Sequence, residues 1–203
     1  AMMPVLNPAG VQDILDMGVL GWAMSRYTGR WVGFKTIAET VESSASVDVD
    51  PHALQIVLPG DDDFEMPAGG LGIRWPDPPM EQEMRLHRYA VKAAQAFARA
   101  NRLDRVVIDS PKARLGIVTT GKSYLDVLQA LEYLGLDEAA CFELGIRVYK
   151  VAMTWPLEPV GIERFARGLE DILVVEEKKA FIERQLKEQF YNWPDSWGPH
   201  PSI

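Results

Sequence analysis

Between residues 80 and 192, short apolar runs alternate with helical patterns, and this alternation constrains the fold more than any other feature of the sequence. The runs expected to be strands are rich in β-branched residues and lie at 105–108, 115–119, 148–153 and 172–175. The segments expected to be helices lie at 80–100, 122–134, 137–144, 159–168 and 178–191. Such alternation favours a mostly parallel sheet with helices on both faces, which predicts an α/β fold of three layers, α/β/α, over residues 80–192.

Three further segments flank or precede this domain. Residues 1–46 predict a partial α/β segment, with a helix that begins at Pro8, is capped by Asn7 and ends at Gly29, followed by a strand at 31–34. No strand is expected before that helix, so the chain is expected to start inside a larger domain. Residues 47–79 are rich in Pro, Gly and Asp and predict a connector with short strands at 53–58 and 71–75. Residues 193–203 predict a linker or a truncated tail.

Composition excludes several classes of function. The chain has 203 residues, a formal charge of −8 and a pI near 4.9, so a nucleic-acid partner is not expected. No apolar run approaches the roughly 20 residues that span a bilayer, and no signal peptide is evident. Cys141 is the single cysteine, and the three histidines are far apart, so neither a metal site nor an internal disulfide is expected. We expect a cytoplasmic protein with no membrane partner.

Residues Gly116 to Ser123, GIVTTGKS, match the phosphate-binding loop pattern G-x-x-x-x-G-K-[ST]. A true loop of this kind follows an apolar strand, and its backbone amides then wrap the phosphates. Here the four residues at 117–120 are all β-branched, which is typical of a strand rather than a loop. The match is therefore expected to be a strand followed by a turn, and a nucleotide-binding protein remains the alternative function.

The turn that remains, Gly121, Lys122 and Ser123, is the candidate cofactor-binding segment. Free amides at the start of a helix attract anions, and a lysine stands beside them. The competing interpretation is that Gly121 makes the turn and that Lys122 and Ser123 cap a surface helix.

Several blocks of sequence resemble a known family. The run from Arg114 to Leu131 and the runs 145–159 and 170–178 look like parts of a transketolase C-terminal-like domain. The runs 7–18, 22–35 and 41–48 resemble the end of a thiamine pyrimidine-binding domain. The order of these blocks is similar to that in the indolepyruvate ferredoxin oxidoreductase family, a thiamine-diphosphate-dependent 2-oxoacid:ferredoxin oxidoreductase type. The resemblance runs from about residue 5 to residue 192.

This resemblance implies an enzyme that oxidatively decarboxylates aryl 2-oxoacids to acyl-CoA and reduces ferredoxin, with thiamine diphosphate, Mg²⁺, iron–sulfur clusters and coenzyme A. It also implies contacts with other domains of the same polypeptide, and a homodimer. The chain shows no Gly-Asp-Gly block for the magnesium diphosphate and no cysteine ladder for clusters. We therefore expect a structural and assembly part of the enzyme, inactive alone, with no catalytic residue and no cofactor bound to it. A non-catalytic interaction or CoA-binding module is a further alternative.

Four other charged residues are candidates for contacts with substrate or cofactor. Arg26 and Lys35 flank the stretch nearest the implied active domain, and either could face a diphosphate, although surface and packing cations are common. Glu176 and Glu177 follow the last predicted strand, at the edge where ligands bind in open α/β sheets. The alternative for the two glutamates is a solvated pair.

Overall fold

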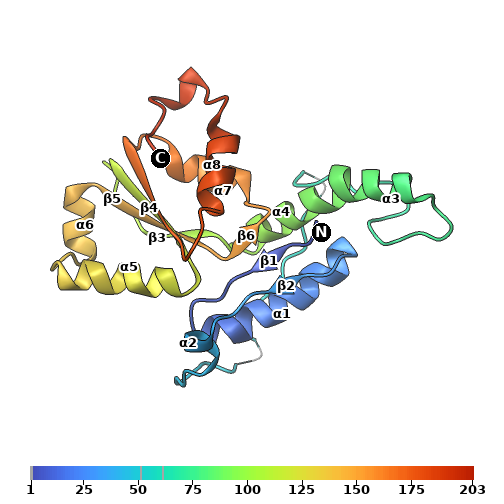
Figure 1. The fold of residues 1–203 in the computed structure, drawn as a ribbon, viewed down its shortest axis with the longest axis horizontal. Coiled ribbons are helices and arrows are strands. Elements are labelled where there is room, and N and C mark those ends of the chain that lie inside the picture. Colours follow the sequence, from blue (N-terminus) through green and yellow to red (C-terminus); the bar gives the residue numbers. More distant parts are fainter. Residues whose placement is uncertain (1, 51, 61) are drawn as a thin grey trace.

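A computed structural model of the chain describes residues 2–50, 52–60 and 62–203. The chain forms two small β-sheets, and a long helical segment, called the helical rod below, extends from the place where they meet (Figure 1). The four-stranded sheet has the order β3-β5-β4-β7, and its strands in chain order are β3 (Arg105–Ile108), β4 (Leu115–Thr120), β5 (Ile146–Val151) and β7 (Asp171–Val175). Strand β4 pairs in parallel with β5 and β7, and only β3 is antiparallel. The predicted α/β class and the mostly parallel sheet are confirmed.

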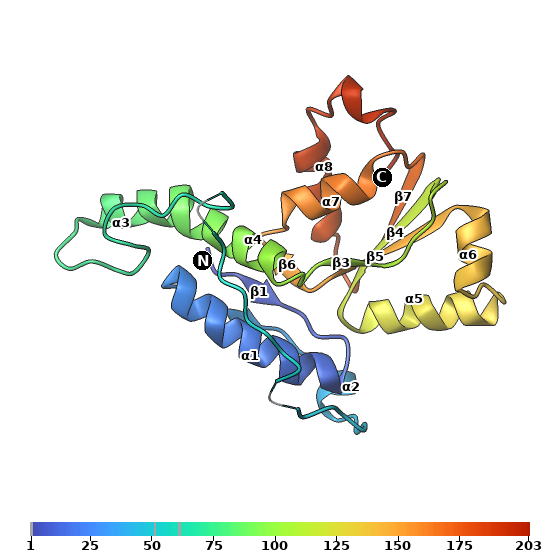
Figure 2. The same cartoon turned by 180° about the vertical axis from the view of Figure 1, so that it is seen from behind.

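Helices cover both faces of this sheet, as the two opposite views show (Figures 1 and 2). Helices α5 (Gly121–Tyr133) and α6 (Glu138–Leu144) lie on one face, and α7 (Pro159–Ala166) and α8 (Ile182–Phe190) lie on the other. The α7 and α8 face is closed by a cluster of buried side chains that includes Val118, Phe165 and Leu186. The α5 and α6 face buries Ile117, Leu131 and others. Successive residues of β4 alternate between the two clusters, as the two-residue period of a strand requires.

The smaller sheet joins the start of the chain to its middle. Its order is β2-β1-β6, with β1 (Val5–Leu6) parallel to β2 (Gly33–Phe34) and antiparallel to β6 (Met153–Trp155). Strand β1 was not predicted. The sequence analysis expected a helix that begins at Pro8 with no strand before it, and this prediction was wrong. Helix α1 runs from Val11 to Thr28, and its N-cap is Gly10 rather than Asn7. The predicted stop at Gly29 is confirmed, because this residue takes the left-handed conformation that ends helices.

The connector before the helical rod contains no regular strand among its described residues. The predictions of strands at 53–58 and 71–75 were wrong, because the backbone of both stretches is extended or forms turns and has no partner in a sheet. A short helix, α2 (Ala38–Val41), precedes the connector. The first residue of the aspartate run at 61–63 lies outside the described residues. The rod that follows is α3 (Pro79–Arg85), a π-helical turn, η1 (Leu86–Ala90), and α4 (Val91–Ala100), so the helix predicted at 80–100 is confirmed.

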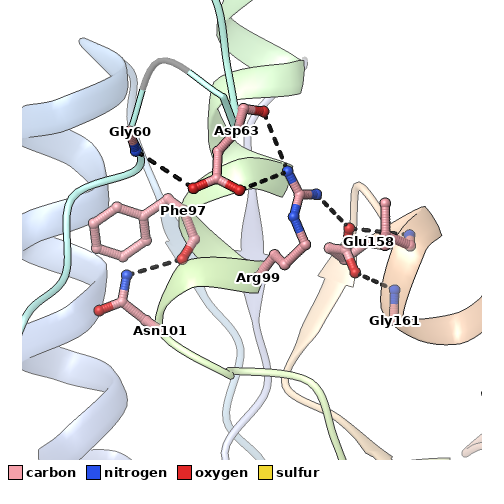
Figure 3. Close-up of polar contacts among 8 residues, drawn as sticks. Gly60, Asp63, Phe97, Arg99, Asn101, Glu158 and Gly161 are labelled. Carbon is pink, nitrogen blue, oxygen red and sulfur yellow. Dashed lines mark hydrogen bonds and ion pairs between the residues drawn. The ribbon is translucent and has the colours of Figure 1, made fainter. Parts of the chain in front are cut away.

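A guanidinium fastens the connector and α4 to the start of α7 (Figure 3). The Arg99 side chain donates to a Glu158 carboxylate oxygen at 2.7 Å and to the Asp63 carbonyl oxygen at 3.2 Å. Glu158 is almost fully buried and also accepts from the amides of Val160 and Gly161, which caps α7. Since a buried carboxylate needs several donors, these contacts keep Glu158 satisfied and tie three segments together.

The residues after 192 lie against α8 and the four-stranded sheet. A 3-10 turn, η2 (Asp195–Trp197), follows Trp193, whose ring packs edge-on against Phe190 and Trp197. Near the end of the chain the Ser202 carbonyl accepts from the Ile172 amide at 2.7 Å. These contacts extend the packing of the α7 and α8 face beyond residue 192. No helix among the described residues is long and apolar enough to cross a membrane.

Candidate functional site

A cavity of about 260 Å³ lies where the two sheets meet. Its walls come from the ends of β4 and β7, from β1, from the segment after β2 and from the start of α5. The polar and charged side chains that line it include Asn7, Lys35, Lys122, Ser123, Glu177 and Lys179. The carboxyl ends of parallel strands are the place where open α/β sheets bind ligands, so the position of this cavity is typical of a binding site.

The β4 residues of the phosphate-loop match are extended and do not curl. Residues 117–120 pair in register with β5, residues 117–119 pair also with β7, and all four are buried. Gly116 lies inside the strand: a Cβ there would overlap Leu169 and would meet Phe165 at 2.7 Å, so the glycine makes room for the α7 side of the core. The prediction that this stretch is a strand is confirmed, and the amides of 117–120 are not arranged to wrap a phosphate.

The sharp turn into α5 is built from Gly121 and two neighbours. Gly121 has φ of 52°, which favours glycine, and the space where a Cβ would stand is occupied by the Asn7 amide group. The Thr120 hydroxyl donates to the Val151 carbonyl at 2.7 Å and accepts from the Asn7 side-chain amide at 3.2 Å. Thr120 is the N-cap residue of α5, but its hydroxyl already bonds the two neighbouring segments and does not cap the helix. The first amides of the helix are therefore available to a ligand.

Of the three basic residues named from the sequence as candidate ligand contacts, two line the cavity and one does not. Lys35, Lys122 and Lys179 line the cavity, whereas Arg26 is exposed in the last turn of α1 and does not line it. Lys122 donates to Asp126 at 2.6 Å, and this hydrogen bond raises the pKa of Lys122 above its ordinary value. Lys35 and Lys179 form no ion pair with any described residue, so their charges are the ones free to meet a ligand.

The two glutamates at the end of β7 differ in what they contact. The Glu176 carboxylate accepts from the amides of Phe181, Ile182 and Glu183 at 2.8–3.1 Å, so it caps the start of α8. Its charge is offset by those amides and by the helix dipole. The exposed Glu177 has no such partners among the described residues. The two residues therefore do not form the solvated pair considered from the sequence.

A buried ion pair fixes α1 against the four-stranded sheet. Lys150, on β5, is buried and donates to Asp13 on α1 at 2.6 Å, and its amine lies 4.7 Å from the centre of the Tyr124 ring. Burial lowers the pKa of Lys150, and the bond to Asp13 opposes that shift. Sequence reasoning missed this pair. The available signal was a lysine within an otherwise apolar strand, which rarely faces inward without a partner.

Asp104 is a second carboxylate that the sequence analysis did not single out. It binds the backbone where the chain passes from β5 to β6. Asp104 accepts from the amides of Ala152 at 2.7 Å and Met153 at 2.9 Å, while its Oδ2 is buried without a partner among the described residues. Burial raises the pKa of Asp104 to about 7, more strongly than the two amide bonds lower it. This residue holds the junction of the two sheets together.

Comparisons with known proteins match this architecture at two levels. The solved structure of a 2-oxoglutarate:ferredoxin oxidoreductase from Magnetococcus marinus, determined with 2-oxoglutarate, coenzyme A and succinyl-CoA bound, superposes with a TM-score of 0.55. The sequence identity is 14%, over 98% of this chain and 38% of that one, so the likeness shows the fold. The chain thus shares its fold with a part of that 2-oxoglutarate:ferredoxin oxidoreductase.

Sequence comparisons give matches to one family. Residues 104–201 match the model described as the indolepyruvate ferredoxin oxidoreductase middle domain. The indolepyruvate oxidoreductase subunit IorA of Pyrococcus abyssi is 28% identical over 191 residues, which cover 92% of this chain and 28% of the relative. The same subunit of Methanothermobacter marburgensis is 31% identical over 96 residues, 47% of this chain and 14% of the relative. The resemblance read from the sequence is confirmed, and residues 104–201 match the model of the middle domain of the indolepyruvate ferredoxin oxidoreductase family.

The chain spans less than a third of the length of these curated relatives. Within the part of the chain that the structure describes, no group of three or more His, Cys, Asp or Glu residues could hold a metal ion. Cys141, the only cysteine in the sequence, is buried. The described residues therefore do not fit an iron–sulfur cluster, which cysteine thiolates hold.

Proposed function

We propose that this chain is the assembly and framing part of an indolepyruvate:ferredoxin oxidoreductase. The complete enzyme would oxidatively decarboxylate aryl 2-oxoacids to acyl-CoA and reduce ferredoxin in the cytoplasm. Thiamine diphosphate, Mg²⁺, the iron–sulfur clusters and the catalytic residues belong in this proposal to other domains of the same polypeptide, acting as a homodimer. The family match over residues 104–201 and the relatives that are oxidoreductase subunits support the proposal.

The observation that carries the assembly role is that α1 is apolar on two faces. Its inner face buries Met17, Leu20 and Met24 against the rest of the chain. Its outer face exposes Trp22, which is 77% exposed, beside the 85% exposed Trp31 that precedes β2. An exposed apolar surface on a helix whose inner face is already packed indicates a surface that another segment covers in the complete protein.

The neighbouring strand has the same character. Strand β2 is an edge of the smaller sheet, and a groove of about 420 Å³ beside it is lined by Gly18, Trp22, Trp31 and Phe34, among others. An apolar groove next to a free strand edge favours pairing with another chain segment. We assign that segment to the remainder of the polypeptide, because the relatives that match this chain are more than three times as long.

The test compares the complete polypeptide with surface variants. In the complete polypeptide, Trp22→Ser together with Trp31→Ser should lower both the fraction of folded enzyme and the rate of ferredoxin reduction with indolepyruvate and coenzyme A. Tyr191→Ser is the matched control, since Tyr191 is 83% exposed and lies after α8, away from the groove. Equal behaviour of the two sets would contradict the assembly role. Turnover of indolepyruvate by the 203-residue chain alone, with thiamine diphosphate and Mg²⁺, would also contradict it.

A further inference from the structure

We propose that the cavity between the two sheets binds a phosphate or diphosphate group. The proposal concerns binding by this chain itself and does not depend on the oxidoreductase role. It differs from the phosphate-loop match, because the amides involved are those at the start of α5 rather than those of residues 117–120.

The first argument is an unsatisfied hydroxyl at the helix start. Ser123 is only 5% exposed and lines the cavity, yet its Oγ makes no hydrogen bond to any described residue. The Oγ is not fully enclosed, so it is open toward the cavity and can donate a hydrogen bond to a ligand there. It lies in the first turn of a 13-residue helix that no side chain caps. The hydroxyl and the free amides therefore present donors to the same space.

The second argument is the charge around the cavity. Lys35 comes from the segment after β2 and Lys179 from the segment before α8, so two cations distant in the sequence converge on one space. Neither forms an ion pair with a described residue. Of the two carboxylates that line the cavity, Glu176 is engaged by three amides of α8, so Glu177 is the lining carboxylate whose charge is not offset. Lys122 is already paired with Asp126, so the proposal rests on the other two lysines.

The chemistry of these donors favours a phosphoryl group over a carboxylate. Two free ammonium groups, a hydroxyl and helix amides approach from different sides, and a phosphate oxygen can face each of them. A cavity of about 260 Å³ accommodates the charged end of a larger molecule. Coenzyme A, thiamine diphosphate and free diphosphate all carry the required group.

The experiment titrates the 203-residue chain with inorganic diphosphate and follows the backbone amide resonances by NMR and the heat by calorimetry. The amides of residues 122–124 should shift in a saturable way, with a Kd of about 1 mM or lower. Lys35→Ala and Lys179→Ala should each weaken binding about five- to tenfold, as expected for one lost charge-assisted contact. Glu177→Gln should tighten binding about two- to fivefold because a repelling charge is removed. Lys187→Ala, which removes a lysine of α8 paired with Glu183, is the control and should change nothing.

Three results would overturn the proposal: no saturable shift of the α5 amides, unchanged affinity in both lysine variants, or acetate binding as tightly as diphosphate. Ser123→Ala provides an independent test in case the lysine variants misfold. It removes the open hydroxyl with little change in volume and should also weaken binding. Parallel titrations with coenzyme A and thiamine diphosphate identify the source. Binding of either one supports the site and names its ligand, and binding of inorganic diphosphate alone supports the site with a free anion as ligand.

Discussion

The buried carboxylate at the sheet junction makes a quantitative prediction about stability and pH. In Asp104→Asn the side chain keeps an oxygen for the amides of Ala152 and Met153 but can no longer become charged. Burial raises the folded-state pKa of Asp104 to about 7, from an ordinary value of 3.8. Its contribution to stability is therefore fully present below about pH 4 and is lost as the pH rises through about 7.

The size of this effect follows from the shift. About three pKa units correspond to about 4 kcal/mol between about pH 4 and pH 8, at about 1.36 kcal/mol per unit. At pH 4 the unpartnered position carries one O–H donor in the neutral Asp104 and an NH2 group with two N–H donors in the asparagine, and both side chains are uncharged. The difference in stability between the two proteins should therefore be small at this pH. At pH 8 the variant should be more stable by up to about 4 kcal/mol, because only the wild type buries a charge.

The assay is urea denaturation followed by tryptophan fluorescence at a series of pH values, with the stability of the wild type subtracted from that of the variant at each pH. Taking the difference cancels the contribution of all other carboxyl groups. Glu188→Gln, on the exposed side of α8, is the control for replacing a carboxyl by an amide and is measured at the same pH values. A flat difference for Asp104→Asn, or a variant less stable than the wild type at pH 8, would refute the reasoning about this carboxylate.

Three further substitutions test the packing around the site. Lys150→Met should lower the free energy of unfolding by about 3 kcal/mol, because it leaves Asp13 partly buried without its cation, and adding Asp13→Asn should recover part of the loss in urea titrations. Gly116→Ala should cost about 1–3 kcal/mol, since the new methyl group would overlap Phe165, and diphosphate affinity should not change by calorimetry. If diphosphate binding is lost while stability is kept, the strand interpretation of 116–120 is wrong. Glu176→Gln should cost about 1 kcal/mol through the weaker cap of α8, and unchanged thermal unfolding would contradict that role.

Much of the large domain could be predicted from the sequence, because its elements are long enough to carry a period. Strand β3 was predicted with its observed bounds, and β4 extends one residue beyond the prediction. The run 148–153 was predicted as one strand, whereas the chain forms β5 and β6 with Ala152 between them. A local pattern of apolar residues does not show where a strand leaves one sheet and enters another.

The candidate site was predicted only in part. Lys35, Lys122 and Ser123 were named from the sequence and do line one cavity, and whether they bind a cofactor stays a prediction. Lys179 and Asn7 were not named as site residues. Nothing near Asn7 in the sequence signals its contact with Thr120, which is 113 residues away.

The sequence by itself determined the periodic elements and the family resemblance, since both are carried by neighbouring residues along the chain. Only the tertiary structure decided β1, a strand of two residues, because such a short segment is extended only where β2 and β6 supply its partners. The same holds for the contacts that define the site. Asp13 and Lys150 are 137 residues apart, and a buried lysine at that position is stable only because folding brings the carboxylate to it.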